Sequence, residues 1–145
     1  MARLLVITAA VMVTASDAAF GGCGDHAFYS TQKEDGTAIG LVATDKDVAR
    51  DPSWAPGHTE PPIAAGRAYD LAVAWAVANW KRFDSFQLES INLQTVGCDS
   101  SGKKWVYVVS LAPVVDGNRL YGGNYVLGVL MDGTLITPTT LKKDF

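Results

Sequence analysis

The stretch from Ile63 to Phe83, IAAGRAYDLAVAWAVANWKRF, constrains the fold more than any other part of the sequence. Between Leu71 and Ala78 large apolar residues alternate with alanine, which is the pattern of a half-buried strand. The stretch is nevertheless about twenty residues long, is rich in the best helix-forming residue, and follows two prolines, where helices commonly begin. We therefore predict a helix here.

On this helix one stripe carries only small side chains, namely those of Ala65, Ala68, Ala72 and Ala76. Larger apolar side chains flank the stripe on both sides, so the helix is suited to close packing against a sheet. Its start is weakly capped. Ala64 stands where Ser, Thr or Asp would accept hydrogen bonds from unpaired N–H groups, and the expected cost is about 1 kcal/mol.

Four segments after the helix have the composition of strands: Phe86 to Val96, Lys104 to Ala112, Asn124 to Met131 and Thr134 to Thr137. The first changes its hydrophobic phase near Ser90, which predicts a β-bulge. The second is apolar on both faces, as in a central strand, and we expect Pro113 to end its ladder. Asp132-Gly133 predicts a tight hairpin, and Gly128 is expected to leave room for the helix.

This order predicts an α+β fold in which one long helix packs across a four-stranded antiparallel sheet. Residues 63–145 are expected to form this helix-plus-sheet domain. Residues 20–62 are expected to be loop-rich, with one short hairpin made by Ala27 to Thr31 and Thr37 to Ala43. Residues 44–62 are interpreted as loop. Asp45, Asp47 and Asp51 in that loop fail the calcium-loop spacing and are interpreted as a solvated turn.

The beginning of the sequence has the pattern of a signal peptide. Arg3 precedes an apolar stretch from Leu4 to Val13, and small residues follow up to Ala19. Residues 1–19 are therefore predicted to be a signal peptide, and the protein is predicted to be secreted or periplasmic. No later stretch is a transmembrane candidate, so no membrane insertion is expected after cleavage.

The two cysteines have two competing interpretations. In an oxidising compartment, Cys23 and Cys98 are predicted to form a disulfide, which would be worth about 4 kcal/mol in the chain-entropy model. Alternatively, Phe20-Gly21-Gly22-Cys23 loosely resembles a bacterial lipobox, which would make Cys23 a lipid anchor. Phe20 in place of the usual Leu and Asp17 in the apolar region argue against the anchor.

The chemistry that the sequence lacks argues against an enzyme. The net charge of −3 gives no electrostatic reason to expect nucleic acid as a partner. The chain has no H-E-x-x-H, G-x-S-x-G or phosphate-binding glycine loop, so neither a catalytic residue nor a cofactor is predicted. Cys23, His26, His58 and Cys98 have the residue types of a zinc site but not its usual spacing, and no metal site is predicted.

Three residues are candidates for binding a partner. Trp54, in a proline-flanked loop, is either a lid that packs on the core or an exposed anchor for a ligand. Arg119 and Tyr121 lie among glycines in a connection, residues 114–123, that is longer than a tight hairpin requires. Because the central strand is apolar on both faces, an uncovered face would imply a homodimer or a larger ligand. Monomer and dimer are both left open.

Three motifs resemble those of PepSY-like, more broadly cystatin-like, exported domains. They are PP-I-x-x-x-x-A at Pro61 to Ala68, W-V-Y-V-V at Trp105 to Val109, and Y-V-L-G-V-L-M-D-G-T-L-I at Tyr125 to Ile136. The resemblance covers about residues 61–137, and Ala64 departs from the Ser usual at the helix start. It implies a non-catalytic module that binds a ligand, protein or peptide in the cell envelope or regulates a protease.

From these observations we expect an exported binding module with a protein or peptide partner. A structural envelope protein or lipoprotein with no dedicated ligand is the alternative interpretation, and an enzyme of unrecognised type is a further one.

Overall fold

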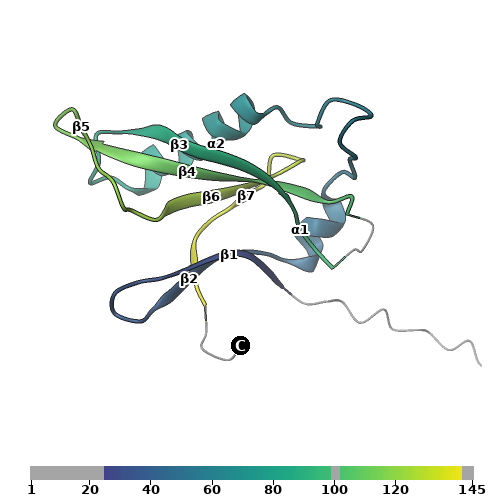
Figure 1. The fold of residues 1–145 in the computed structure, drawn as a ribbon, viewed down its shortest axis with the longest axis horizontal. Helices are drawn as coiled ribbons and strands as arrows, with labels where there is room; N and C mark the ends of the chain where they lie inside the picture. Colours follow the sequence, from purple (N-terminus) through teal and green to yellow (C-terminus); the bar gives the residue numbers. More distant parts are fainter. Residues whose placement is uncertain (1–24, 99–101, 142–145) are drawn as a thin grey trace, which may run out of the picture.

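The computed structural model describes residues 25–98 and 102–141. In these residues the chain forms two antiparallel sheets and two helices (Figure 1). The elements in chain order are β1 (His26–Gln32), β2 (Ala38–Ala43), α1 (Asp45–Arg50), α2 (Ala65–Asn79), β3 (Ser85–Thr95), β4 (Trp105–Val115), β5 (Asn118–Arg119), β6 (Tyr125–Leu130), β7 (Leu135–Ile136) and β8 (Thr139–Thr140). None of these helices is long and apolar enough to span a membrane.

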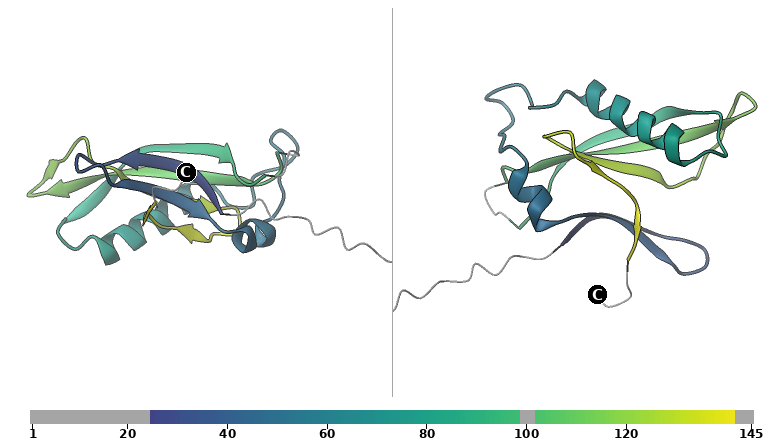
Figure 2. Two further views of the ribbon diagram at one scale, coloured as in Figure 1. Left: turned by 90° about the horizontal axis from the view of Figure 1, so that it is seen from below. Right: turned by 180° about the vertical axis from the view of Figure 1, so that it is seen from behind.

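The predicted helix is confirmed as α2, which lies across one face of a sheet of order β3-β4-β6-β7, with β5 paired to β4 (Figure 2). Ala68, Ala72 and Ala76 are fully buried against this sheet. They contact a core that includes Val109 and Leu127. Ala64 is the N-cap and makes no side-chain hydrogen bond, as expected.

Two local predictions for this sheet are confirmed and one is wrong. The pairing of β3 with β4 shifts register between Leu88 and Ser90, which is the expected bulge, and the hairpin between β6 and β7 turns at Asp132-Gly133. Pro113, however, does not end the ladder of β4. It pairs with Phe86, and its carbonyl oxygen accepts the N–H of Leu120 at 2.8 Å, because proline lacks only the donor of a ladder bond.

The connection after β4, expected to be a long loop, instead begins with a tight hairpin. Asp116 and Gly117 have φ of 49° and 74°, and β5 pairs with the end of β4 directly after them. Two successive residues at positive φ are the requirement of a type I′ turn, which Asp-Gly favours. The sequence signal was therefore present, and the length of the connection hid it.

The predicted architecture of one helix on one four-stranded sheet is wrong, because a second sheet covers the other face. The expected hairpin exists as β1 and β2, but it is joined by β8 into a three-stranded sheet. Leu41 and Ala43 of β2 are buried against residues that point away from α2, namely Val106, Val108, Val126, Leu130 and Ile136. Figures 1 and 2 show α2 and the β1–β2 hairpin on opposite sides of the larger sheet.

Gly128 serves this second sheet and not the helix. A Cβ atom at Gly128 would lie 2.6 Å from Cζ of Phe28 in β1. The helix packs instead on the face that carries Leu127 and Val129. Both apolar faces of β4 are therefore covered within one chain, and the argument for a dimer from an open sheet face no longer applies.

Residues 44–62 are not entirely loop, because they contain helix α1. Thr44 caps it: the side chain of Thr44 accepts the N–H of Asp47 at 3.2 Å, and the carboxylate of Asp47 accepts the N–H of Thr44 at 3.2 Å. This reciprocal pair is a capping box with Asp in the position more often held by Glu. Asp51, expected to be solvated, is only 1% exposed.

Candidate functional site

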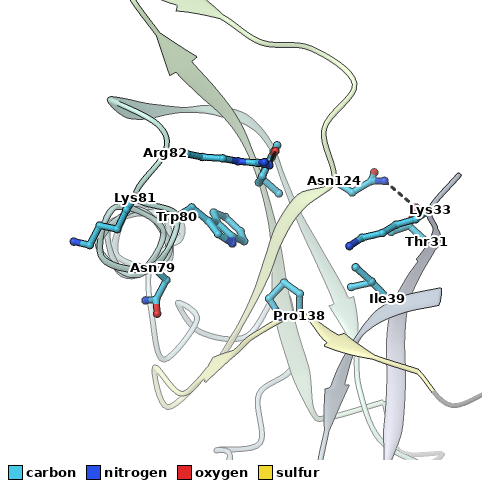
Figure 3. A pocket seen from close by; sticks show the side chains of 10 residues that line it. Thr31, Lys33, Ile39, Asn79, Trp80, Lys81, Arg82, Asn124 and Pro138 are labelled. Atoms are coloured by element: carbon cyan, nitrogen blue, oxygen red, sulfur yellow. Dashed lines mark hydrogen bonds between the residues drawn. The ribbon is translucent and has the colours of Figure 1, made fainter. Parts of the chain in front are cut away.

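A pocket of about 550 Å³ lies where the end of α2, the β1–β2 hairpin and the start of β6 meet (Figure 3). This volume is within the range of small-ligand sites. The pocket lies beside the first half of β6. Because β7 pairs with β6 only at Gly128 and Val129, no described strand lies beside that half of β6 on this side.

The end of α2 sets the inner wall of the pocket. The helix stops at Asn79, and Trp80 leaves helical geometry with φ −101° and ψ 63° while its N–H still donates to the carbonyl of Ala76. The N–H of Phe83 then donates to the carbonyl of Trp80 at 3.2 Å, which closes a short turn. Trp80 and Phe83, at the two ends of this turn, both pack against the ring of Tyr125.

Two aromatic rings, Trp80 and Tyr125, line this wall, and further aromatic rings that do not line the pocket hold them in place. The Trp80 ring makes edge contacts with the rings of Trp75 and Tyr125, at centroid distances of 5.2 and 5.1 Å. Phe83 packs edge-on against Tyr125 at 5.0 Å, and Phe86 lies 5.7 Å from Trp80. Edge-to-face packing of this kind favours fixed ring orientations. The apolar wall is therefore formed before any ligand arrives.

The opposite wall comes from the other sheet. Ile39 of β2 and Pro138, between β7 and β8, supply apolar surface there, and Thr31 supplies a hydroxyl group. Asn124 spans the two walls, because its Nδ2 donates to Oγ1 of Thr31 at 3.0 Å (Figure 3). The hairpin is thereby tied to the start of β6.

Three of the lining residues are cationic and none is acidic. Arg82 donates to the hydroxyl of Tyr125, and its guanidinium lies 4.6 Å from the centroid of the Phe83 ring. Lys33 extends from the hairpin toward the cavity, whereas Lys81 points away from it (Figure 3). The pocket lining is therefore positively charged, although the chain as a whole has a net charge of −3. Lys33 and Arg82 are the two cations able to meet a ligand.

The nearest acidic residues along the chain lie outside this lining. Glu34 and Asp35 form the turn between β1 and β2. The carboxylate of Asp35 accepts the N–H of Thr37 at 2.8 Å, and this bond holds the pKa of Asp35 below its ordinary value. The positive charge of Lys33 also lowers the pKa of Asp35, to a smaller extent than the hydrogen bonds to Thr37, while the Lys33 side chain extends toward the pocket.

Trp54 is half-buried and packs against Trp105. Its Nε1 donates to the carbonyl of Thr59 at 2.9 Å, and its ring lies edge-on to Trp105 at a centroid distance of 5.7 Å. Nε1 of Trp105 in turn donates to the carbonyl of Trp54 at 3.1 Å. Of the two interpretations from the sequence, these contacts fit the lid.

Arg119 and Tyr121 lie together at the other end of β4. The Arg119 guanidinium is 5.3 Å from the centroid of the Tyr121 ring, and Tyr121 is 78% exposed. Trp105 begins β4 and Arg119 pairs with Val114 near its end, so Trp54 and this pair are separated by about 30 Å at the usual rise per residue. The three candidates therefore do not form one site, and none of them lines the pocket.

The structure brings together two of the four residues considered for zinc. Sγ of Cys98 lies 3.3 Å from Nε2 of His26, while His58 is exposed in the connection between α1 and α2. Cys23 lies outside the described residues, as do the signal-peptide and lipobox segments. The disulfide with Cys98 stays a prediction, and the described residues contain no group of three or more His, Cys, Asp or Glu placed to hold a metal.

Sequence reasoning missed the pocket because its residues come from four distant segments. The one available signal was Asn79-Trp80-Lys81-Arg82, where an aromatic residue and two cations follow directly on the end of the helix. The contributions of Lys33, Asn124 and Pro138 depend on the second sheet. That sheet was not predicted, so the pocket could not be.

No protein-family model matches the chain, and no curated protein or solved structure matches it significantly. The site must therefore be interpreted from its own geometry.

Proposed function

We propose that this chain is an exported, non-catalytic binding protein whose ligand carries a carboxylate next to an apolar group. One observation carries the proposal: a preformed aromatic wall and two available cations, Lys33 and Arg82, line a pocket with no acidic side chain. Arg82 suits a carboxylate because its planar donors can bind both oxygens. The Trp80 wall and Pro138 suit an apolar side chain.

The C-terminal residue of a peptide has both required groups, and so does a fatty acid. The peptide agrees with the protein or peptide partner expected from the sequence, and with what the resemblance to PepSY-like domains implies. Asn79, Asn124 and Thr31 also line the pocket. Nδ2 of each asparagine already makes one hydrogen bond within the protein, but the side-chain oxygens of Asn79 and Asn124 and the hydroxyl hydrogen of Thr31 can bond to the peptide groups before the terminal residue. A fatty acid would leave these groups unused.

The test uses two short acetylated peptides that end in phenylalanine, one with a free carboxylate and one with a terminal amide. Binding is measured by calorimetry and by tryptophan fluorescence, since Trp80 lines the site. The acid is expected to bind at least about tenfold more tightly than the amide, because a charge-assisted bond contributes about 1.5–3 kcal/mol. Dodecanoate, measured in parallel, distinguishes a fatty-acid ligand from a peptide.

Variants localise the binding. Arg82→Gln and Lys33→Gln are each expected to abolish the preference for the acid, whereas Lys46→Gln, an exposed change on α1, should leave it intact. Tyr125→Phe removes the hydroxyl partner of Arg82 but keeps the charge, so it separates loss of charge from loss of position. Equal affinity for acid and amide, or no binding of any of the three compounds, would reject the proposal and favour a structural protein.

A further inference from the structure

The strands at the two ends of each sheet, β3 and β7 in the larger sheet and β1 and β8 in the smaller one, differ in how well their outer edges are protected. At one end of the larger sheet β7 has only two residues, and β8 at one end of the smaller sheet also has two. β1 carries a register shift between Ala27 and Tyr29, and its Phe28 carbonyl accepts the side chain of Gln94 at 2.8 Å. Short strands, bulges and covered carbonyls are devices that stop edges from pairing with other chains.

The fourth edge, β3, lacks these devices in its second half. β3 has eleven residues and pairs only with β4 among the described residues. The bulge between Leu88 and Ser90 interrupts its first half. From Ser90 to Thr95 the sequence is SINLQT, without a charge, a proline or a glycine. A regular, uncharged edge of this kind is a template for another strand.

The ladder identifies the backbone groups that this edge presents. The N–H of Val96 donates to the carbonyl of Lys104 at 3.0 Å, and the register continues without a shift back to Ser90. In an antiparallel pair the bonding direction alternates along the strand, so the N–H and C=O groups of Ile91, Leu93 and Thr95 point away from β4. Leu93 is also 37% exposed, although it is a large apolar residue.

This edge is complementary to itself. With a two-fold axis at Leu93, antiparallel pairing sets Leu93 opposite Leu93 of a second copy, Ile91 opposite Thr95, and Asn92 opposite Gln94. Every residue with outward backbone groups then meets another such residue. The nearest charge, Glu89, faces Gly97, so no like charges are opposed. Direct opposition of like charges destabilises a strand pair and is one of the devices that prevent self-pairing.

We propose that a second copy of this chain docks on β3, so that the larger sheets of two molecules join through Ser90 to Thr95 about a two-fold axis at Leu93. Each outward N–H and C=O in that stretch gains a partner, and the exposed Leu93 side chains pack on each other. This interface uses no residue that lines the pocket, so it is independent of the proposed ligand binding.

The first test is sedimentation velocity of the wild-type protein over a concentration series. The protein is expected to sediment with twice the mass of one chain at high concentration. Leu93→Lys sets two ammonium groups against each other on the axis and should give a single-chain mass at every concentration. Leu88→Lys is the matched control, since Leu88 is 40% exposed on the same strand but lies before the bulge. It should keep the dimer.

Amide hydrogen exchange of the wild-type protein provides a second test that needs no variant. The outward amides of Ile91, Leu93 and Thr95 should exchange slowly at high concentration and quickly on dilution. The amides of Asn92 and Gln94, which bond to β4, should exchange slowly at both high and low protein concentration. A single-chain mass throughout, equal loss of dimer in the Leu88→Lys and Leu93→Lys variants, or slow outward amides at all concentrations would each overturn the proposal. The last result would show that another part of the same chain covers the edge.

Discussion

Asp51 is a buried carboxylate, and its effect on the stability of the fold can be measured as a function of pH. The residue caps the C-terminal end of α1 and is 1% exposed. Its Oδ1 accepts the N–H of Asp132 at 2.9 Å, while its Oδ2 is buried without a hydrogen-bond partner among the described residues. The ammonium group of Lys104 donates to the backbone carbonyl of Asp51, and its positive charge offsets only part of the effect of burial on the carboxylate. Burial raises the pKa of Asp51 from 3.8 to about 6.

The raised pKa has a definite sign for stability. The folded state binds the proton of Asp51 more tightly than the unfolded state, so this contribution is fully present below about pH 4 and is lost as the pH rises through about 6. A shift of about two pKa units corresponds to about 3 kcal/mol. Asp51→Asn keeps an oxygen to accept the N–H of Asp132 but cannot ionise. We expect the variant to be more stable than wild type by about 3 kcal/mol near pH 7.5, and equally stable near pH 4.

The assay is urea denaturation followed by tryptophan fluorescence, repeated over this pH range for wild type and Asp51→Asn. Asp70→Asn, at an exposed position of α2, is the control for loss of one negative charge and should follow the wild-type pH dependence. The reasoning is refuted if Asp51→Asn and wild type lose stability in parallel between pH 4 and 7. A variant less stable than wild type at neutral pH would show that the second carboxylate oxygen has a donor.

Three further substitutions test the packing and the helix starts, with thermal or urea denaturation as the measurement. Gly128→Ala places a methyl group 2.6 Å from Phe28 and should lower the free energy of unfolding by about 1–3 kcal/mol. Unchanged stability would mean that Phe28 of the smaller sheet does not pack closely against β6. In the first turn of α2, the Cβ atom added by Gly66→Ala would have no atom within 4 Å, and the substitution should stabilise the fold by about 0.5 kcal/mol. Thr44→Ala removes the capping box with Asp47 and should cost about 1 kcal/mol, whereas no loss would show that α1 contributes nothing to stability.

The elements after residue 63 could largely be predicted because their signals are local. The alanine stripe of α2, the phase change at Ser90 and the Asp132-Gly133 turn each lie within a few neighbouring residues. Pro113 and the Asp116-Gly117 turn were misjudged although their signals were local too. Pro113 was expected to end β4, but a proline removes only one hydrogen-bond donor and its carbonyl still accepts. The Asp116-Gly117 turn was overlooked because residues 114–123 are more numerous than a tight hairpin requires.

The second sheet could not be predicted in the same way, because it depends on pairing between distant segments. Lys104 to Ala112 showed that two apolar faces needed covering, but nothing local connected this need to Leu41 and Ala43. The two-residue strand β8 is too short to leave a pattern. The burial of Asp51 was hidden for the same reason, since its partner Asp132 lies in a hairpin far along the chain.

The pairing of β8 with β2 has a consequence for the order in which the protein folds. Ile39 and Gly40, near the start of the described chain, pair with Thr140 and Thr139, near its end. The smaller sheet therefore cannot be completed until residues 139–140 have been synthesised, and contacts of such long sequence separation slow folding. The β1–β2 hairpin can form earlier from neighbouring residues, but its second edge gains a partner only when Thr139 and Thr140 are available.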